Sequence, residues 1–443
     1  IKMRKALLSI LFSLTLYYPA AWAQQFRWVE LPNSPRPDSI IDARFEDMYF
    51  CDANSGYVIT YTGNIYRTTD GGANWTSTSK LVYAARSVGF FTPETGIVGT
   101  LDSTRVLFRT TNGGANWTDI MPSIQGVMPK GICGISIVDA NTAYGVGRYF
   151  CPSNIIKTTN SGLNWISIPI DTSLMRSAVD VKFWSADSGF VIGGYSPTNQ
   201  YSSGRSVVLF TSNGGQTFQR VWYSSAAQPN QWGWKIQFVN RQLGYIAIEN
   251  FSAGYYLKTT NGGMNWTSFL IGGQYNFEGI GFINETTGWI GGWGTNYHMP
   301  TIETTNAGAS WHQAGWGFNV NRFRFINDTL AYAVGHRVFK YMRQSVGIQQ
   351  ISSEVPENFS LSQNYPNPFN PTTQIKYALR LVDDVSLKVY DAKGNLVATL
   401  VDGFQEAGVY SITFDASELP SGVYYYKLIA KQFQETRKMV LVK

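Results

Sequence analysis

Apolar and polar residues alternate in short runs along most of the chain, and the runs recur at a regular spacing. In seven places an apolar residue stands six positions before a small residue, and each such pair predicts a strand, a tight turn and a second strand. The distance between pairs, roughly 40 to 55 residues, is that of four-stranded propeller blades. The pairs are Phe50/Gly56, Phe90/Gly96, Ile137/Ala143, Phe183/Gly189, Phe238/Gly244, Phe282/Gly288 and Phe325/Ala331.

A second repeat lies between these pairs and reads Thr, any residue, Asp or Asn, any residue, Gly, two further residues and an aromatic. It occurs six times, first from Thr68 to Trp75. The Asp or Asn side chain can accept backbone N–H groups inside a turn, and the Gly can adopt the positive φ that the turn requires. We interpret the motif as structural, because a catalytic residue is needed once and not in every blade. Its acidic or amide residues are Asp70, Asn112, Asn160, Asn213, Asn261 and Asn306.

The last repeat is incomplete, and the N-terminus offers the missing part. The seventh copy has three strand patterns and then neither the turn motif nor a fourth strand. Residues 25–32 resemble the fourth strands at residues 116–122 and 164–169. We therefore expect the N-terminal strand to complete blade seven, which leaves no open sheet edge at a seam. The pattern predicts a seven-bladed β-propeller over residues 24–343.

The start of the chain has the composition of a secretory signal. Arg4 and Lys5 precede an apolar stretch at residues 6–18, and Ala21-Trp22-Ala23 fits cleavage after a small residue. We expect residues 1–23 to be removed. No later segment offers the roughly 18 consecutive apolar residues that a membrane helix needs, so no transmembrane segment is predicted in the mature chain.

Composition supports an all-β chain and argues against several functions. Aromatic residues make up 15% of the chain against 14% charged residues, with 43 Gly, which suits many short strands joined by tight turns. The formal charge is +6, but three of the basic residues lie in the expected signal and no run of Lys and Arg follows, so we do not expect nucleic-acid binding. The three His residues lack metal-ligand spacing, and neither a metal site nor a cofactor is predicted.

Three Cys residues are an odd number for an oxidising compartment. Cys133 and Cys151 fall within one repeat and are candidates for a disulfide bond. Cys51 lies inside a strand pattern and is interpreted as a buried thiol. None of these residues predicts catalysis.

The sequence changes character after the repeats. A polar stretch at residues 344–357 is interpreted as a linker. Residues 364–373 cannot form a helix or a central strand, because three prolines fix φ and lack the N–H donor. Alternating runs with turns at residues 391–394 and 420–422 then predict a small Ig-like β-sandwich, and we assign it residues 358–443.

Both parts of the chain resemble known families. The turn motif is similar to the Asp box of sialidase-like propellers. The repeats across residues 24–343 resemble the photosystem II assembly and stability factor family, whose members are seven-bladed propellers that act as assembly chaperones without catalysis. Similar repeats occur in sortilin-type receptors and in some glycoside hydrolases. The resemblance is specific for the fold, and it implies a binding scaffold.

The C-terminal part resembles the type A sorting domain of type IX secretion. The resemblance rests on the Asn-Tyr-Pro-Asn-Pro-Phe-Asn-Pro opening at residue 364, Val389-Tyr390-Asp391 with Gly394, and residues 421–424. It implies the type IX machinery as a partner, passage across the outer membrane, and then removal of the domain or its replacement by a surface anchor. The matching terminal residues are Lys438, Met439, Val440, Leu441, Val442 and Lys443.

Two groups of residues are candidates for ligand binding. The loops between strands two and three and between blades share the face opposite the Asp boxes, and here they are long and aromatic. Exposed aromatic residues beside Arg148 and Arg205 would resemble the centre of an interface, although several of them would serve equally well to pack loops onto the blades. The aromatic candidates are Tyr149, Trp232, Trp234, Trp293 and Tyr297.

The second group consists of charged residues that stand three or four positions before the repeated apolar residue. We expect them to ring the mouth of the central channel. There they form either a solvated rim or a site that holds a sugar or peptide by charged hydrogen bonds. The residues are Glu46, Arg86, Asp180, Lys235, Glu278 and Arg322.

Two functions compete on these residues. The first is an exported or cell-surface, non-catalytic binding or scaffold propeller with a protein or glycan ligand. The second is a sialidase-like glycoside hydrolase using two carboxylates from Glu46, Asp180 and Glu278. A sialidase also needs an arginine triad with a Tyr/Glu pair. Arg86 and Arg322 are candidates, but the sequence does not supply the complete set, so it favours binding.

Overall fold

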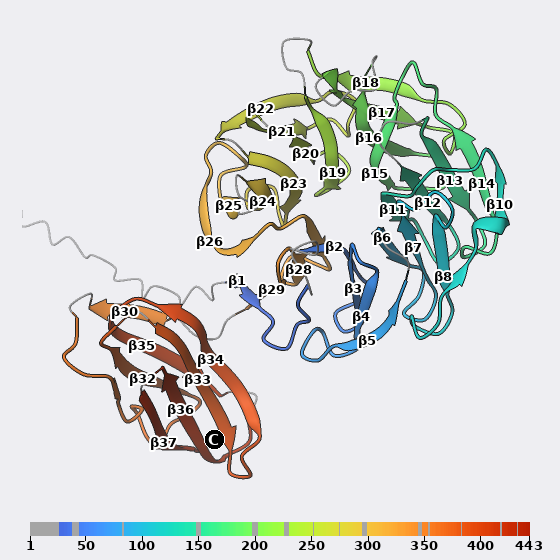
Figure 1. The fold of residues 1–443 in the computed structure, drawn as a ribbon. Coiled ribbons are helices and arrows are strands. Elements are labelled where there is room, and N and C mark those ends of the chain that lie inside the picture. The colour runs from blue at the N-terminus through green and yellow to red at the C-terminus, as the bar shows by residue number, and fades with distance from the viewer. Residues whose placement is uncertain are drawn as a thin grey trace, which may run out of the picture. The chain divides into compact units, whose positions relative to one another are not determined.

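A computed structural model shows two compact units, residues 27–342 and residues 343–443 (Figure 1). The expected signal peptide lies outside the described residues. No helix in the described part of the chain is long and apolar enough to cross a membrane. The structure describes residues 26–37, 44–81, 84–147, 152–196, 203–225, 230–250, 252–273, 275–294, 299–343, 348–352, 355–381, 383–416, 419–431 and 433–443.

The first unit is a seven-bladed propeller, as predicted, with seven sheets arranged around a centre (Figure 1). Blade 1 contains β2 (Phe45–Phe50), β3 (Gly56–Thr60), β4 (Asn64–Thr68) and β5 (Thr76–Lys80), and blade 2 contains β6 (Ala85–Phe90), β7 (Gly96–Thr100), β8 (Leu107–Thr110) and β9 (Thr118–Asp119). Blade 3 contains β11 (Gly134–Ile137), β12 (Ala143–Gly147), β13 (Asn154–Thr158) and β14 (Trp165–Pro169), and β10 (Ile124–Gly126) adds to β14 in parallel. Blade 4 contains β15 (Ser177–Phe183), β16 (Gly189–Tyr195), β17 (Arg205–Thr211) and β18 (Gln219–Tyr223), and blade 5 contains β19 (Trp232–Phe238), β20 (Gly244–Glu249), β21 (Gly254–Thr259) and β22 (Thr267–Gly272). Blade 6 contains β23 (Tyr275–Phe282), β24 (Gly288–Gly294), β25 (Pro300–Thr304) and β26 (His312–Phe318), and blade 7 contains β27 (Arg322–Phe325), β28 (Ala331–Val334), β29 (Val338–Arg343) and β1 (Phe26–Glu30).

The N-terminal strand closes the propeller, as the sequence predicted. Strand β1 pairs with β29, and Leu31 N donates to Val338 O at 3.0 Å just beyond the strand. Trp28, which is 6% exposed, stacks on Trp316 with a ring distance of 4.7 Å. The first and last parts of the propeller therefore complete one blade.

The repeated apolar and small residues join neighbouring blades. In five blades a Phe ends the inner strand and its ring covers the facing Gly, so closely that a Cβ at Gly56 would lie 2.3 Å from Phe50. In four blades the residue after the repeated Gly or Ala is a Tyr that stacks on the repeated Phe of the next blade. These stacks have ring distances of 3.5 to 3.7 Å: Tyr57 on Phe90, Tyr144 on Phe183, Tyr245 on Phe282, and Tyr332 of blade 7 on Phe50 of blade 1.

The side chains of the Asp boxes form hydrogen bonds within their own turns, and the Thr takes part in them. In all six boxes the Thr hydroxyl donates to the Asp or Asn side chain at 2.8–3.0 Å and accepts from the Gly N–H at 2.8–3.1 Å. The Asp or Asn oxygen accepts the N–H four residues later at 2.9–3.0 Å. The first Asp box also contacts the preceding blade, because Lys340 of blade 7 donates to Gly71 O.

The boxes allow a stability prediction. In every box the residue just before the Gly of the motif has a positive φ. This residue is Ala307 (φ 61°) in blade 6 and Ser161 (φ 56°) in blade 3. Ala307→Gly should raise the free energy of unfolding by about 1 kcal/mol, because it removes a Cβ from a left-handed conformation. Ser161→Gly is the matched control. Its free energy of unfolding should rise less, because the substitution also removes the hydrogen bond that the Ser161 hydroxyl donates to Ala140 O at 2.8 Å. Urea unfolding measures both, and a less stable Ala307→Gly protein would contradict the expectation.

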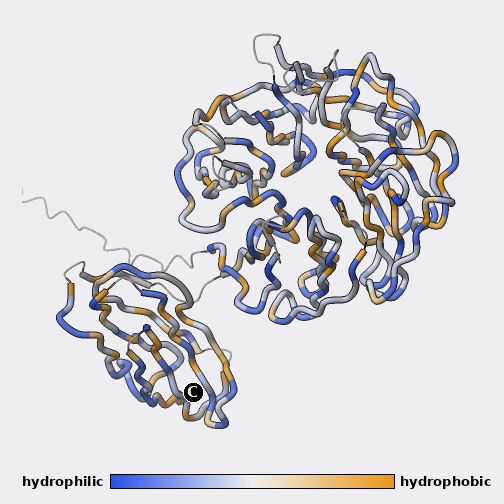
Figure 2. The backbone as a smooth tube through the Cα atoms, viewed as in Figure 1, coloured by the Kyte–Doolittle hydropathy of each residue, from blue (hydrophilic) through white to orange (hydrophobic). Residues whose placement is uncertain are grey.

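The second unit is a sandwich of two four-stranded antiparallel sheets. Hydrophobic and hydrophilic residues alternate along many strands of both units (Figure 2). In the sandwich the apolar residues form a single core that includes Phe369, Ile375, Leu387, Tyr426 and Met439. One sheet contains β30 (Ile348–Ser352), β31 (Ser360–Leu361), β32 (Thr372–Leu379) and β35 (Gly408–Asp415), and the other contains β33 (Asp383–Asp391), β34 (Leu396–Gln405), β36 (Gly422–Ala430) and β37 (Phe433–Leu441).

The structure corrects the interpretation of residues 344–357 as a linker. Strand β30 lies inside this segment and pairs with β35 as an edge strand of the sandwich. The short sequence Ile-Gln-Gln-Ile-Ser has no clear apolar alternation, because an edge strand needs backbone pairing on one side only. The sandwich thus begins before residue 358.

The cysteines are described in part. Cys51 follows β2 and is half-buried rather than buried, and burial raises the pKa of its thiol to about 12. Cys133 is buried just before β11. Cys151 lies outside the described residues, so a disulfide with Cys133 remains a prediction.

Candidate functional site in the central channel

Irregular inner strands place charged residues in the channel. The inner strands of five blades have a β-bulge, seen as a register shift, four positions before the repeated apolar residue. A bulge sets two residues opposite one and re-aims the side chains. The bulged residues are Glu46, Arg86, Val179, Trp234 and Glu278.

The three bulged charged residues and Arg44, which precedes β2, form one group, which we call the mouth cluster: Arg44, Glu46, Arg86 and Glu278. Arg44 forms ion pairs with Glu278 and, at 3.7 Å, with Glu46. Arg86 pairs with Glu46 from the next blade. Burial lowers the pKa of Arg44, and Glu278 opposes that effect. These side chains are only 3% to 12% exposed, so the expectation of a solvated rim is wrong for them.

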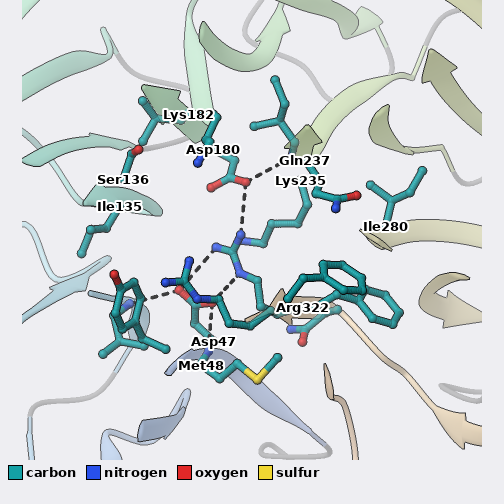
Figure 3. Close-up of a pocket in the computed structure, with 18 of the residues that line it drawn as sticks. Asp47, Met48, Ile135, Ser136, Asp180, Lys182, Lys235, Gln237, Ile280 and Arg322 are labelled. Atoms are coloured by element: carbon teal, nitrogen blue, oxygen red, sulfur yellow. Dashed lines mark hydrogen bonds and ion pairs between the residues drawn. The ribbon is translucent and has the colours of Figure 1, made fainter. Parts of the chain in front are cut away.

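The charges three positions before the repeated apolar residue form a second group, the pocket cluster: Asp47, Asp180, Lys235 and Arg322. They line a pocket of about 200 Å³ in the channel (Figure 3). Arg322 donates to Asp47 Oδ1 at 2.5 Å and to Asp180 Oδ2 at 3.4 Å. Figure 3 shows Asp180 and Asp47 on opposite sides of the Arg322 guanidinium. The four side chains come from four different blades.

Backbone groups hold the two pocket carboxylates in place. Asp47 accepts the N–H groups of Met48 at 2.9 Å and Val88 at 3.1 Å, and Asp180 accepts that of Ile236 at 3.2 Å. Each bond to Val88 or Ile236 crosses to a neighbouring blade. The carboxylates therefore have fixed positions before any ligand binds.

Burial and neighbouring charges shift the pKa values of the cationic side chains in the pocket. Burial alone would lower the pKa of Arg322, but Asp47 and Asp180 raise it above its ordinary value. Burial, assisted by Arg322, lowers the pKa of Lys235 to about 8 against the attraction of Asp180. Burial also lowers the pKa of Lys182, which lines the same pocket together with Arg324.

This arrangement is suited to holding charge. A glycoside hydrolase needs a carboxylic acid that donates a proton to the leaving group. Each carboxylate of the two clusters is instead an ion-pair partner of an arginine. The carboxylates proposed for hydrolysis are also divided, since Glu46 and Glu278 lie in the mouth cluster and Asp180 in the pocket cluster.

Two of the candidate tryptophans are not exposed. Trp232 is 1% and Trp234 3% exposed. The Trp232 ring occupies the space left by two glycines of blade 4, because a Cβ at Gly194 would lie 2.1 Å and one at Gly204 2.4 Å from it. Arg86 lies over the Trp234 ring at 5.2 Å. The expected exposure is thus wrong for both residues, and they pack the blades.

The remaining candidates are only partly described. Trp293 is half-buried, and Arg44 of the mouth cluster lies 4.1 Å above its ring. Tyr149 and Tyr297 lie outside the described residues, so a role for them in binding remains a prediction. Arg205 lies over Tyr223 at 3.4 Å on blade 4 and does not join the channel clusters.

Family models match both units of the chain. Residues 363–443 match the family described as "Secretion system C-terminal sorting domain", and residues 35–173 match "Photosynthesis system II assembly factor YCF48". The chain joins a YCF48-like propeller to a type IX sorting domain. The sorting domain indicates secretion to the cell surface or beyond through the type IX machinery.

Solved structures agree with the propeller fold. YCF48 from Cyanidioschyzon merolae is 18% identical, with a TM-score of 0.52 over 71% of this chain and 98% of that one. A structure of YCF48 bound to D1 peptide is 15% identical, with a TM-score of 0.50 over 72% and 97%. The WD40 propeller of Doa1 is 9% identical, with a TM-score of 0.50 over 73% and 98%. Among curated proteins, none is similar enough in sequence to count as a match.

The motifs of the sorting domain meet in space. Phe369 N donates to Val440 O at 2.9 Å, and Val442 N donates to Phe369 O at 3.0 Å. Asn367 Oδ1 accepts from Val440 N at 2.9 Å. Residues 438–441 belong to strand β37, so the terminal motif is also part of the sandwich itself.

Sequence reasoning missed part of the site in the YCF48-like propeller. Asp47 stands three positions before Phe50, where Asp180, Lys235 and Arg322 stand in their blades, so this signal was present in the sequence. Arg44 and Arg324 lie outside the positions considered. The separation into two clusters depends on the bulges, which the repeat pattern does not reveal.

Proposed function

We propose that this chain is an exported, non-catalytic binding protein whose propeller holds a peptide ligand in the channel. The observation that carries the proposal is the pocket cluster. Four charged side chains from four blades are fixed around a pocket of about 200 Å³, and both carboxylates are already engaged by Arg322 and backbone N–H groups. Such a preformed site, with few convergent polar groups, is typical of binding.

A peptide is the ligand class that the observations favour. The sequence left both a sugar and a peptide open as ligands held by charged hydrogen bonds at the channel. A propeller of similar fold, YCF48, has been solved with a D1 peptide bound. We infer a peptide ligand for this chain as well, without assigning its identity.

A ligand screen tests the proposal. The mature chain from residue 24 to 443 should bind members of a peptide array and no member of a glycan array. The isolated residues 344–443 serve as the control and should bind neither. Incubation with chromogenic glycosides should release no product. Glycan binding without peptide binding, or product release, would contradict the proposal.

A further inference from the structure

We propose that the channel pocket is an oxyanion site that takes a carboxylate group, with the Lys235 ammonium as its main contact and Lys182 and Arg324 beside it. The inference rests on the proposed function and names the chemical group that the propeller recognises. The carboxylate belongs either to a free small anion or to an acidic side chain or C-terminus of a peptide.

Lys235 is a buried cation without a direct partner. It is 6% exposed, and its ammonium makes no hydrogen bond or ion pair within 4.0 Å to the residues that the structure describes. Asp180 and Asp47 attract it only at longer range. Burying an ammonium in this way is costly unless a counter-charge is supplied. Since the ammonium borders the pocket, an anion in the pocket would supply that charge.

The other charges of the pocket point to the same ligand. The lining contains four cations, Lys182, Lys235, Arg322 and Arg324, and two carboxylates, Asp47 and Asp180. Both carboxylates are bound to Arg322. Arg324 donates to Phe50 O at 3.2 Å and lies over Tyr49, and neither contact neutralises it. The pocket thus has a surplus of positive charge where Lys182, Lys235 and Arg324 border it.

The structure also indicates the face from which the anion enters. The mouth cluster lies toward the loop face of the channel, where the Arg44–Glu278 and Arg86–Glu46 pairs join blades 1, 2 and 6, and none of these residues lines the pocket. The lining extends instead to Ile137, Phe238 and Phe325, which end the inner strands at the hairpin turns. We therefore place the entrance on the face of the hairpins and Asp boxes, opposite the aromatic loops favoured by the sequence.

The size of the pocket limits the ligand. A pocket of about 200 Å³ has room for a carboxylate with a short stem and not for a folded partner. The rest of a peptide would stay outside the entrance.

Calorimetry on the mature chain tests the site. Acetate, succinate, an acidic peptide with a free C-terminus, and the same peptide with amide groups in place of its carboxylates are titrated at constant ionic strength. At least one carboxylate probe should bind, and Lys235→Met should weaken it at least tenfold. Lys80→Met replaces an exposed lysine of blade 1 and should change the affinity less than twofold. Binding of acetate or succinate identifies a free anion as the source, and binding of the acidic peptide alone identifies a peptide.

Two controls keep the result interpretable. Lys235→Met should melt no earlier than the wild type, because it removes a buried ammonium, and Lys182→Met provides a second variant with weakened anion binding. If Lys235→Met binds every probe within twofold of the wild type, or if the amidated peptide binds as well as the acidic one, the oxyanion site is wrong. Neither result would contradict the proposed binding function, because the peptide array tests that function separately.

The pH dependence gives an independent readout. Between pH 7 and 9.5 the affinity of the wild type should fall several-fold, because the ammonium of Lys235 loses its proton near pH 8. The charged groups that face it are Asp47 on β2, Arg86 on β6, Asp180 on β15 and Arg322 on β27. In the Lys235→Met protein the residual affinity should change less over the same range. Equal pH profiles for the two proteins would overturn the assignment.

Discussion

A chain that stops after Arg343 should fold but fail to reach the cell surface. The propeller closes on itself through β1 and β29, and Tyr332 stacks on Phe50 across the closure, so no strand of the sandwich is needed to complete a blade. Without the sorting domain the propeller should be retained inside the outer membrane. Fractionation of the native host with an antibody to the propeller should show at least a tenfold loss from surface and medium. Normal surface levels would contradict this role of the domain.

Reporter fusions provide the matched control. Residues 344–443 fused to an unrelated secreted reporter should carry it across the outer membrane. A fusion that begins at residue 358 should be exported less efficiently, because it lacks β30, the partner of β35. Deleting residues 438–443 would shorten β37, so a loss of export could result from a misfolded sandwich as well as from the loss of a recognised motif. Val442→Asp separates the two effects better. Val442 is 51% exposed, so this substitution should reduce export without unfolding the domain.

Replacing Arg322 with Met should reduce the free energy of unfolding by about 3–5 kcal/mol, because it leaves two buried carboxylates without their cation. Asp47 and Asp180 are each 1% exposed, and Arg322 is the ion-pair partner of both. Equilibrium unfolding in urea measures the change.

Two comparisons isolate the cause of this loss. Arg105→Met, at an exposed arginine, should change the free energy of unfolding by less than about 0.5 kcal/mol. Adding Asp47→Asn to Arg322→Met should recover part of the loss, because one of the unpaired charges is removed. If Arg322→Met unfolds like the wild type, the two buried carboxylates do not depend on Arg322 for their stability.

The propeller was predictable because its signals are local. A Phe and a Gly six positions apart mark a hairpin whose ring-over-glycine packing is repeated in five of the seven blades, and an Asp box encodes its own turn hydrogen bonds. Strand β30 escaped prediction because its pairing with β35 spans about 60 residues and is not reflected in an apolar alternation. The fold class was thus available from the sequence, and the exact start of the sandwich was not.

The site was predictable in its residue types but not in its grouping. The sequence placed Glu46, Asp180, Glu278 and Arg322 around one channel, and the structure divides them between two clusters. The division depends on bulges, which interrupt the period-two alternation that sequence reasoning relies on. The burial of Trp232 depends on Gly194 and Gly204 in the neighbouring blade, and no pattern near Trp232 itself reveals those partners.

The shared blade 7 has a consequence for the order of events during folding. Strand β1 is made first, whereas β29, the strand it pairs with, is among the last parts of the propeller to be made. The hydrogen bonds between these two strands need both ends of the propeller at once. The ring can therefore close only after nearly all of the propeller has been synthesised.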